Sequence, residues 1–338
     1  MRILVTGGAG FIGSNACARF SGAGHEVLSL DNLSRVGSER NATWVRETHA
    51  VANENVDVRD AAAVEALVAR FAPEVVIHCA GQVAVTTSVV DPRRDFEENS
   101  LGTFNVLEAV RCKAPRAIFV FASTNKVYGG MEDVHLEFSG QRWRYVDLPR
   151  GASEERPLDF HSPYGCSKGA ADQYVRDYAR IYGLRTVVLR QSCIYGYRQF
   201  GVEDQGWVAW FTIRSLKRQP VTIFGDGCQV RDVLFIDDLL DAYAAAIERI
   251  DVAAGRVYNV GGGAANALSL RELVSKLDAL NGYPLQVADG DWRPGDQRVF
   301  IADVGKMERE LGWAPKVGVD QGVSRLHAWV KDNLTAMP

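Results

Sequence analysis

Short apolar runs alternate with longer amphipathic stretches over most of this chain. Continuous apolar runs of about 4 to 8 residues are typical of strands buried on both faces of a parallel sheet. Stretches with alanine, leucine and other apolar residues at helical spacing predict helices that cover those faces. The predicted strands are Arg2–Thr6, Glu26–Leu30, Val56–Val58, Glu74–His78, Ala117–Phe121, Arg185–Arg190 and Arg256–Gly261.

Helices are predicted between these strands. They run from the first glycines to about Ala23, from Asp60 to Phe71, from Asp95 to Ala114 and from Tyr164 to Tyr182. Strand and helix in strict alternation specify an α/β fold with a doubly wound parallel sheet. Residues 130–159, rich in charge, glycine and proline, predict a surface excursion.

The regular alternation weakens after Gln191. An aromatic cluster at 207–211 precedes predicted helices at 237–250, 268–281 and 320–334, with a loop at 291–301. Aromatic residues at such spacing form core or, as the alternative, a wall against a base or sugar. We therefore predict a smaller, discontinuous substrate-binding domain of residues 191–231 with 266–338, beside a dinucleotide-binding (Rossmann) domain of residues 1–190 with 232–265.

A glycine-rich turn directly follows the first predicted strand. Gly7, Gly10 and Gly13 have the spacing G-x-x-G-x-x-G and open a helix. Glycines there let the backbone approach a pyrophosphate, which rests on the helix N-terminus. Asp31 ends the second strand, where a carboxylate can bond the adenosine ribose and favours NAD. Arg35 follows shortly and offers the alternative of meeting the 2′-phosphate of NADP.

Two side chains with proton-transfer chemistry lie four residues apart. If Pro163 occupies the first helical turn, Tyr164 and Lys168 share one helix face. A nearby cation favours a phenolate, which makes the tyrosine a candidate base. Thr124 ends a parallel strand, where α/β sheets bind ligands. His78, inside a buried strand, is interpreted as a core histidine.

Composition excludes several classes of function. The 338 residues are 47% hydrophobic and 24% charged, with a net charge of −4. That balance predicts no broad positive surface for nucleic acid and no membrane partner. The six cysteines form no C-x-x-C pair and the six histidines no H-x-x-x-H pair, so we expect no metal site and reduced thiols in a cytoplasmic compartment. Glycines interrupt the apolar N-terminus too early for a signal peptide or spanning helix.

These motifs together resemble the extended short-chain dehydrogenase/reductase family over nearly the whole chain. The strings that carry the resemblance are Thr6–Gly13, Asp31–Leu33, Ser123–Thr124, Tyr128–Gly129 and Tyr164 with Lys168. The resemblance implies bound NAD and a catalytic triad of Thr124, Tyr164 and Lys168. It also implies cofactor contacts by Gly7, Gly10, Phe11, Ile12, Gly13, Asp31, Asn32, Asp57, Val58, Ala80, Gly81, Asn99, Tyr164 and Lys168, and a homodimer or homotetramer built on paired helices.

Within that family the chain is most similar to NAD-dependent nucleotide-sugar epimerases, closer to those that invert C2 of a CDP-linked dideoxyhexose than to 4-epimerases. The former make sugars for lipopolysaccharide O-antigen. Related 4,6-dehydratases place Asp-Glu after the catalytic threonine, whereas this chain has Asn125 and Lys126. Two departures are the loosely matched segment 36–55 and Tyr197, where relatives often carry glycine or proline. A nucleotide-diphosphate sugar, with a CDP-hexose favoured, is the expected partner.

The expected reaction removes a hydride from C2 and returns it to the other face of a transient 2-keto sugar. Tyr164 takes the hydroxyl proton, with a pKa lowered by Lys168 and the cationic nicotinamide. Candidate substrate contacts are Gln82, Thr124, Gln191, Arg198, Trp207, Arg231 and Arg298. Among these, Arg231 and Arg298 suit the diphosphate, with surface ion pairing as the alternative.

Three other functions fit parts of the pattern. A UDP-sugar 4-epimerase would use the same triad. An NAD(P)-dependent sugar reductase would need an exchangeable cofactor, and a non-catalytic NAD sensor would not need the Tyr164–Lys168 pair.

Overall fold

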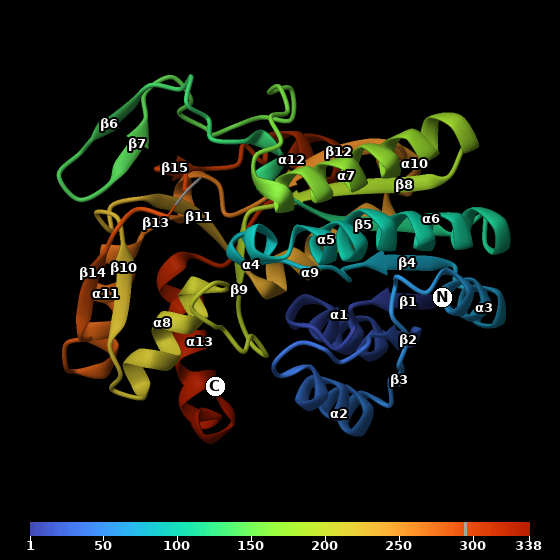
Figure 1. The fold of residues 1–338 in the computed structure, drawn as a ribbon, viewed down its shortest axis with the longest axis horizontal. Helices are drawn as coiled ribbons and strands as arrows, with labels where there is room; N and C mark the ends of the chain where they lie inside the picture. The colour runs from blue at the N-terminus through green and yellow to red at the C-terminus, as the bar shows by residue number, and fades with distance from the viewer. Residues whose placement is uncertain (294–295) are drawn as a thin grey trace.

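A parallel sheet of seven strands organises the chain (Figure 1). The computed structural model describes residues 1–293 and 296–338, so residues 294 and 295 of the predicted 291–301 loop lie outside the described part. In spatial order the strands are β12 (Arg256–Val260), β8 (Arg185–Gln191), β5 (Ile118–Thr124), β4 (Val75–His78), β1 (Arg2–Thr6), β2 (Glu26–Leu30) and β3 (Ala52–Glu54). The strand order reverses between β1 and β4, which is where open α/β sheets bind ligands. The predicted doubly wound α/β fold is confirmed.

Helices cover both faces of this sheet (Figure 1). One face buries apolar residues of α3 (Ala61–Phe71), α6 (Gly102–Lys113) and α7 (Ser162–Tyr182). The other face buries α1 (Phe11–Gly22) and α9 (Ile236–Glu248), and its core continues into the smaller part of the molecule. Because both faces are covered, the residues of the central strands β4, β5 and β8 are almost completely buried, as their continuous apolar runs predict.

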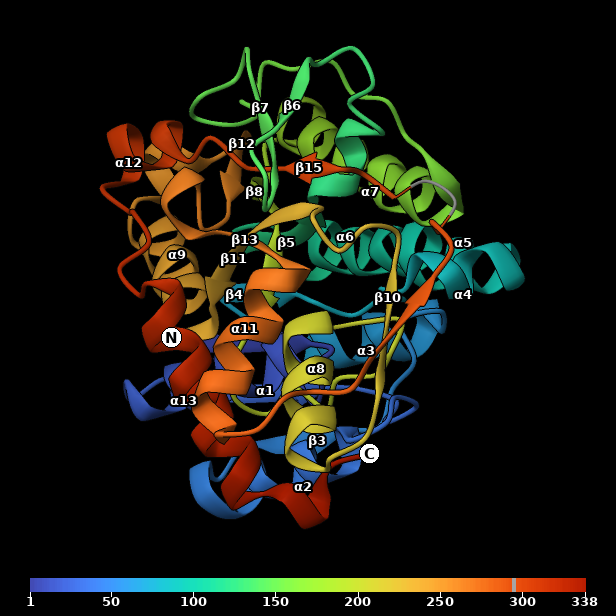
Figure 2. The same cartoon turned by 90° about the vertical axis from the view of Figure 1, so that its left-hand side faces the viewer.

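The remaining elements of the first half connect the sheet strands or flank the site. They are α2 (Ser38–His49), α4 (Val85–Val90), α5 (Pro92–Phe96), the π-helix η1 (Glu97–Leu101), the 3-10 helix η2 (Asn125–Tyr128) and the hairpin strands β6 (Leu136–Phe138) and β7 (Trp143–Tyr145). The hairpin projects from one end of the molecule (Figure 2) and lies within the predicted surface excursion of residues 130–159.

The second half builds two smaller sheets and the helices around them. Strands β9 (Cys193–Tyr195), β11 (Val230–Phe235), β13 (Ala267–Ser269) and β15 (Val299–Phe300) form one sheet, and β10 (Val221–Phe224) pairs with β14 (Val287–Gly290) in the other (Figure 1). The helices are α8 (Trp207–Leu216), α10 (Ile250–Ala253), η3 (Ala264–Asn266), α11 (Leu270–Asn281), α12 (Gly305–Leu311), α13 (Val319–Asp332) and η4 (Leu334–Ala336). Strand β11 crosses the predicted domain boundary after residue 231, and the division into two domains stays a prediction.

The third strand of the sheet differs from its prediction. The valines Val56 and Val58 suggested a strand, but the residues that pair with β2 are Ala52–Glu54. Polar side chains hold this edge, because the Asn53 amide oxygen accepts from Ser29 Oγ at 2.6 Å and its amide nitrogen donates to the Asp31 carbonyl at 3.2 Å. An edge strand fixed by side-chain hydrogen bonds gives no apolar signal in the sequence.

The long helix predicted from Asp95 to Ala114 is interrupted. It consists of the end of α5, the π-helix η1 and α6, three segments that follow one another directly. A π-helical turn inserts one extra residue and is frequent at functional sites. This turn contains Asn99, one of the predicted cofactor contacts.

His78 has the structural role that the sequence predicted. Its ring is completely buried, with Nδ1 at 2.6 Å from Thr6 Oγ1 and Nε2 at 2.9 Å from Thr103 Oγ1. Burial lowers the pKa of His78 to about 3, so the ring is neutral at working pH. Among the described residues, no helix is both long and apolar enough to cross a membrane.

Candidate active site

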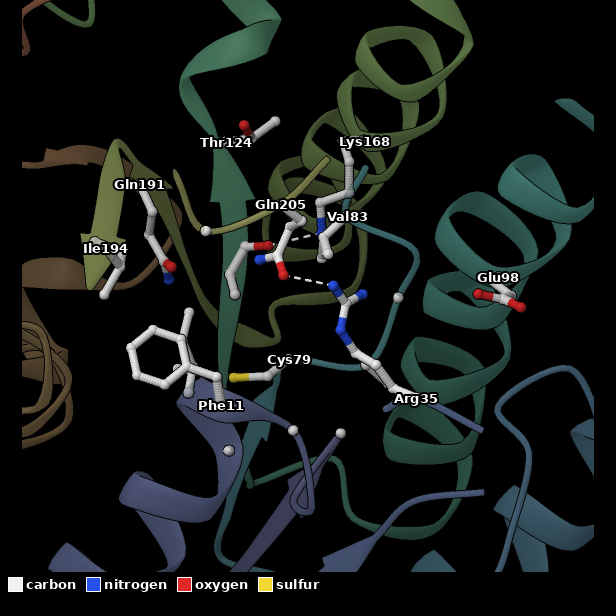
Figure 3. Close-up of a pocket in the computed structure, with 18 of the residues that line it drawn as sticks. Phe11, Arg35, Cys79, Val83, Glu98, Thr124, Lys168, Gln191, Ile194 and Gln205 are labelled. Atoms are coloured by element: carbon white, nitrogen blue, oxygen red, sulfur yellow. Dashed lines mark hydrogen bonds between the residues drawn. The ribbon is translucent and has the colours of Figure 1, made fainter. Parts of the chain in front are cut away.

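One cavity of about 410 Å³ lies at the carboxyl ends of the central strands and extends toward β9 and α8. Thr124 from the end of β5, Lys168 from α7 and Gln191 from the end of β8 lie around it (Figure 3). The glycine-rich turn before α1 lines the opposite side. The cavity therefore joins the predicted triad and the predicted dinucleotide contacts in one space.

The predicted helix start places the two titratable residues as expected. Pro163 occupies the first turn of α7, and Tyr164 and Lys168 follow four residues apart with 7% and 6% of their surfaces exposed. Lys168 Nζ donates to the Ala122 carbonyl at 2.7 Å and lies 4.2 Å from the centre of the Phe121 ring. Strand β5 thus fixes the ammonium from one side.

Burial governs the protonation of this pair. It raises the pKa of Tyr164 to about 12, opposed by the hydrogen bond with Thr124, and lowers the pKa of Lys168 to about 8. The sequence predicted a lowered tyrosine pKa, but in the chain by itself desolvation outweighs every stabilisation of the phenolate. A base at this position therefore needs a further positive charge in the pocket.

The glycine-rich turn has the shape of a pyrophosphate cradle. A Cβ on Gly13 would lie 2.0 Å from the Gly7 carbonyl oxygen, and a Cβ on Gly7 would lie 2.7 Å from the backbone nitrogen of Ala80. Gly10 is the N-cap of α1 and provides no side-chain acceptor for the first helical N–H groups. These free N–H groups favour the binding of an anion at the helix N-terminus.

The adenosine side of the cavity contains the predicted acidic residue. The Asp31 carboxylate accepts from the backbone nitrogens of Ala9 at 3.0 Å and Leu33 at 2.8 Å, and burial raises its pKa. Asn32 donates to Asp57 at 2.8 Å. All the other predicted cofactor contacts line the cavity except Asn99, whose completely buried amide oxygen has no hydrogen-bond partner among the described residues. That oxygen lies 2.4 Å from where a Gly81 Cβ would be.

A dinucleotide fits this set of residues. Only glycines leave room for a ligand at this turn, because a Cβ there would collide with the backbone. The N-terminus of α1 has no side-chain cap, and the buried Asn99 oxygen has no partner among the described residues, so both can bond polar groups of a ligand. The predicted contacts other than Asn99 line one cavity, and their role in binding the cofactor stays a prediction.

The predicted substrate contacts divide into two groups. Gln191 and Trp207 line the cavity together with Thr124. Gln82 does not, because its amide nitrogen bonds the Ala84 carbonyl at 2.7 Å and Asp95 at 3.1 Å. Arg198 does not either, since its guanidinium stacks 3.9 Å from the centre of the Trp44 ring.

The two arginines predicted for the diphosphate also lie outside the cavity lining. Arg231 is 8% exposed and pairs with Asp296 at 2.6 Å. Arg298 is exposed and lies over the rings of Trp143 and Trp292 at 4.8 and 5.8 Å. Arg231 therefore forms an ion pair, as the alternative prediction has it, but this pair is largely buried instead of lying on the surface.

Sequence reasoning missed a contact across the cavity mouth. Arg35, from the loop after β2, donates to the Gln205 amide oxygen before α8 (Figure 3). The two residues are 170 positions apart, so no local pattern links them. From the sequence, the only predicted role of Arg35 is the alternative contact to the 2′-phosphate of NADP. The cavity is also lined by Ser34, Cys79, Val83, Val85, Glu98, Lys126, Cys193, Ile194, Gln199 and Gly206.

Comparison with known proteins identifies relatives over the full chain. Residues 3–261 match the model of the NAD dependent epimerase/dehydratase family. The CDP-paratose 2-epimerase of Salmonella typhi is 42% identical over 334 residues, which cover 97% of this chain and 99% of that protein. The UDP-glucose 4-epimerase of Mycolicibacterium smegmatis is 33% identical, with 96% of this chain and 97% of that protein covered.

Solved structures agree with the fold and the cofactor. The UDP-glucose 4-epimerase of Thermus thermophilus, determined in complex with NAD, superposes with a TM-score of 0.82 at 36% identity and covers 97% of this chain and 98% of that one. The resemblance to NAD-dependent nucleotide-sugar epimerases of the short-chain dehydrogenase/reductase family is confirmed, and so is the predicted cofactor NAD.

Replacing Gly13 by alanine tests the cradle. The new methyl group meets the Gly7 carbonyl and displaces the turn, so we expect NAD binding to weaken by about tenfold or more, the size of one lost charge-assisted hydrogen bond. Gly22→Ala is the matched control, because a Cβ there has nothing within 4 Å. NAD released from the purified proteins is measured by absorbance and enzymatic cycling. Equal NAD content in both variants would contradict the assignment.

Proposed function

The chain belongs to the NAD dependent epimerase/dehydratase family, and we propose that it inverts C2 of CDP-paratose to give CDP-tyvelose, or acts on a close CDP-linked hexose. The observation that carries this proposal is the 42% identity, over nearly the full length of both chains, to a CDP-paratose 2-epimerase. The UDP-glucose 4-epimerase of Mycolicibacterium smegmatis is less similar, at 33%.

The triad residues have complementary tasks in this reaction. Tyr164 takes the proton of the C2 hydroxyl, and Thr124, which lines the same cavity, holds the same oxygen in line. Lys168, anchored on the Ala122 carbonyl, keeps a positive charge on the tyrosine face of α7. Bound NAD supplies the hydride acceptor and donor, and the further positive charge that the pocket needs. The 2-keto sugar must expose its other face before C2 is reduced again.

The residues after Thr124 favour epimerisation over dehydration. Elimination of water needs an additional acid and base, whereas this chain has an amide and an ammonium group at Asn125 and Lys126. Neither can act as the carboxylic acid of a dehydratase.

A UDP-sugar 4-epimerase remains the second candidate. Its support is the likeness to UDP-glucose 4-epimerases in sequence and structure, and the triad alone does not distinguish the two reactions. A net reductase or an NAD sensor has less support, since the intact triad lines the same cavity as the cofactor contacts.

We also propose a cellular compartment for the enzyme. All six cysteines are free thiols, which suits a reducing compartment, and we place the enzyme in the cytoplasm. A CDP-tyvelose product would serve lipopolysaccharide O-antigen synthesis.

An apolar surface on α5, η1, α6 and α7 supports a homodimer. Phe104 of α6 and Tyr174 of α7 meet edge to face with ring centres 5.8 Å apart, and their helices lie next to each other (Figure 1). The exposed apolar residues of this surface are Phe96, Leu101, Phe104, Tyr174, Ile181 and Tyr182. Clusters of large apolar side chains of this kind mark association sites. We therefore propose a dimer through these helices, with a tetramer as the larger alternative.

We expect a charged side chain introduced into this apolar surface to separate the subunits. We expect Ile181→Asp to shift the protein toward monomer in sedimentation velocity, because Ile181 is 66% exposed in the single chain and would be buried in the dimer. Val287→Asp, on β14 and 40% exposed, leaves the assembly unchanged. A wild-type monomer at micromolar concentration would reject the dimer.

The substrate is tested with two nucleotide sugars. Purified protein is incubated separately with CDP-paratose and UDP-glucose, and proton couplings at C2 and C4 are read by NMR. We expect inversion at C2 of the CDP sugar alone. Inversion at C4 of UDP-glucose would replace the proposed substrate with that of the second candidate.

The role of the phenol is tested on the same helix. Tyr164→Phe removes the proton acceptor, and we expect kcat to fall by about a hundredfold or more. Tyr174→Phe is the control, since its side chain is 49% exposed on the outer face of α7. NAD content verifies that both variants are folded. A Tyr164→Phe enzyme with substantial turnover would exclude Tyr164 as the base.

A further inference from the structure

Lys126 is tied to the catalytic threonine but is not part of the triad. It is the second residue of η2, directly after β5, and its backbone N–H donates to Thr124 Oγ1 at 3.2 Å. Lys126 is also one of the residues that line the cavity. The lysine therefore lies next to the position where Thr124 holds the reacting oxygen.

The ammonium group has few partners in the described part of the chain. Lys126 Nζ donates to Gln297 Oε1 at 3.3 Å, and the Gln297 amide nitrogen in turn donates to the Gly129 carbonyl. Gln297 is only 2% exposed, so its oxygen is fixed in place. An ammonium has three N–H donors, and this contact uses one of them.

Positive charge is in excess around Lys126. Arg231 of β11 and Asp296 lie close enough to affect its pKa, as does Cys193 of β9. Asp296 forms its ion pair with Arg231 at 2.6 Å and is the only carboxylate among these neighbours. Two cations thus lie near one carboxylate in a partly buried place, which is costly unless a further anion compensates.

The chemistry of the substrate supplies such an anion. In a sugar linked through C1 to a diphosphate, C2 is bonded to the carbon that carries the phosphate, whereas C4 lies on the opposite side of the ring. A site that holds the C2 oxygen at Thr124 therefore brings the nearest phosphate close to Thr124 as well. A cation belongs there, and the carboxylates that dehydratases place after their threonine would repel the phosphate.

We propose that Lys126 is a substrate-binding residue whose ammonium contacts the phosphate nearest the sugar and so positions C2 beside Thr124 and Tyr164. This inference rests on the proposed function. Arg231, which forms an ion pair with Asp296, provides a second positive charge near Lys126. The lysine thereby favours sugars that react next to their phosphate.

Binding of CDP separates this role from a structural one. We expect Lys126→Met to weaken CDP binding, measured by titration calorimetry, by about tenfold or more, while cytidine binding and NAD content stay unchanged. Lys126→Arg keeps the charge and retains most of the affinity. Lys331→Met, at an exposed position of α13, is the matched control.

The pH dependence of binding gives a second readout. Burial and Arg231 lower the pKa of Lys126 to about 8, so the ammonium is present below that pH and is lost as pH rises through it. We expect the affinity of wild type for a CDP-sugar to fall above about pH 8, and Lys126→Arg to remove that fall, because a guanidinium stays charged. Burial raises the pKa of the facing Cys193 thiol, which stays neutral there.

The outcomes distinguish this inference from the proposed function. If wild type binds UDP instead of CDP, the proposed nucleotide is wrong, and the same variants are titrated with UDP, whose diphosphate is identical. If folded Lys126→Met, with normal NAD content, binds the diphosphate as wild type does, the contact is rejected while the proposed reaction stands. Equal loss of cytidine and CDP affinity would also reject it, since that pattern indicates a distorted pocket.

Discussion

The site depends on burying a phenol and an ammonium group together at the end of the sheet. Ionisable groups in such a place favour their neutral forms, and both Tyr164 and Lys168 respond in that direction. The last residues of β5 make the arrangement possible, because the Ala122 carbonyl accepts from Lys168 and Thr124 lines the same cavity as both residues. In this poorly screened space, one added charge changes the proton affinity of both residues strongly.

A polar network fixes the other side of the catalytic helix. Ser167, between the two catalytic residues, donates to Asp95 at 2.5 Å, and Ser100 donates to the Ser167 carbonyl at 2.9 Å. Asn99 bonds both Asp95 and Ser167. The π-helical turn η1 presents Asn99 and Ser100 to α7, so an irregularity in one helix sets the position of the other. This network leaves one Asn99 oxygen directed toward the cofactor side.

Sequence reasoning succeeded where chemistry and local pattern coincide. Gly13 has to be glycine because the Gly7 carbonyl occupies the place of its side chain, and Tyr164 and Lys168 share a helix face because of their spacing. It failed where distant segments decide the outcome. The third strand is Ala52–Glu54, whose backbone pairs with β2 and whose Asn53 side chain bonds Ser29, and Arg198 stacks on Trp44, far from it in sequence. The neighbours of Lys126 come from residues about 70 to 170 positions later, which no spacing rule could bring together.

In the proposed reaction the hydrogen on C2 leaves and returns within one site. CDP-paratose carrying deuterium at C2 is converted in ordinary water, and the product is examined by NMR and mass spectrometry. We expect the CDP-tyvelose formed to retain the deuterium at C2. Replacement of that deuterium by hydrogen from solvent would show exchange through a free carbanion or enol and would rule out hydride transfer at C2.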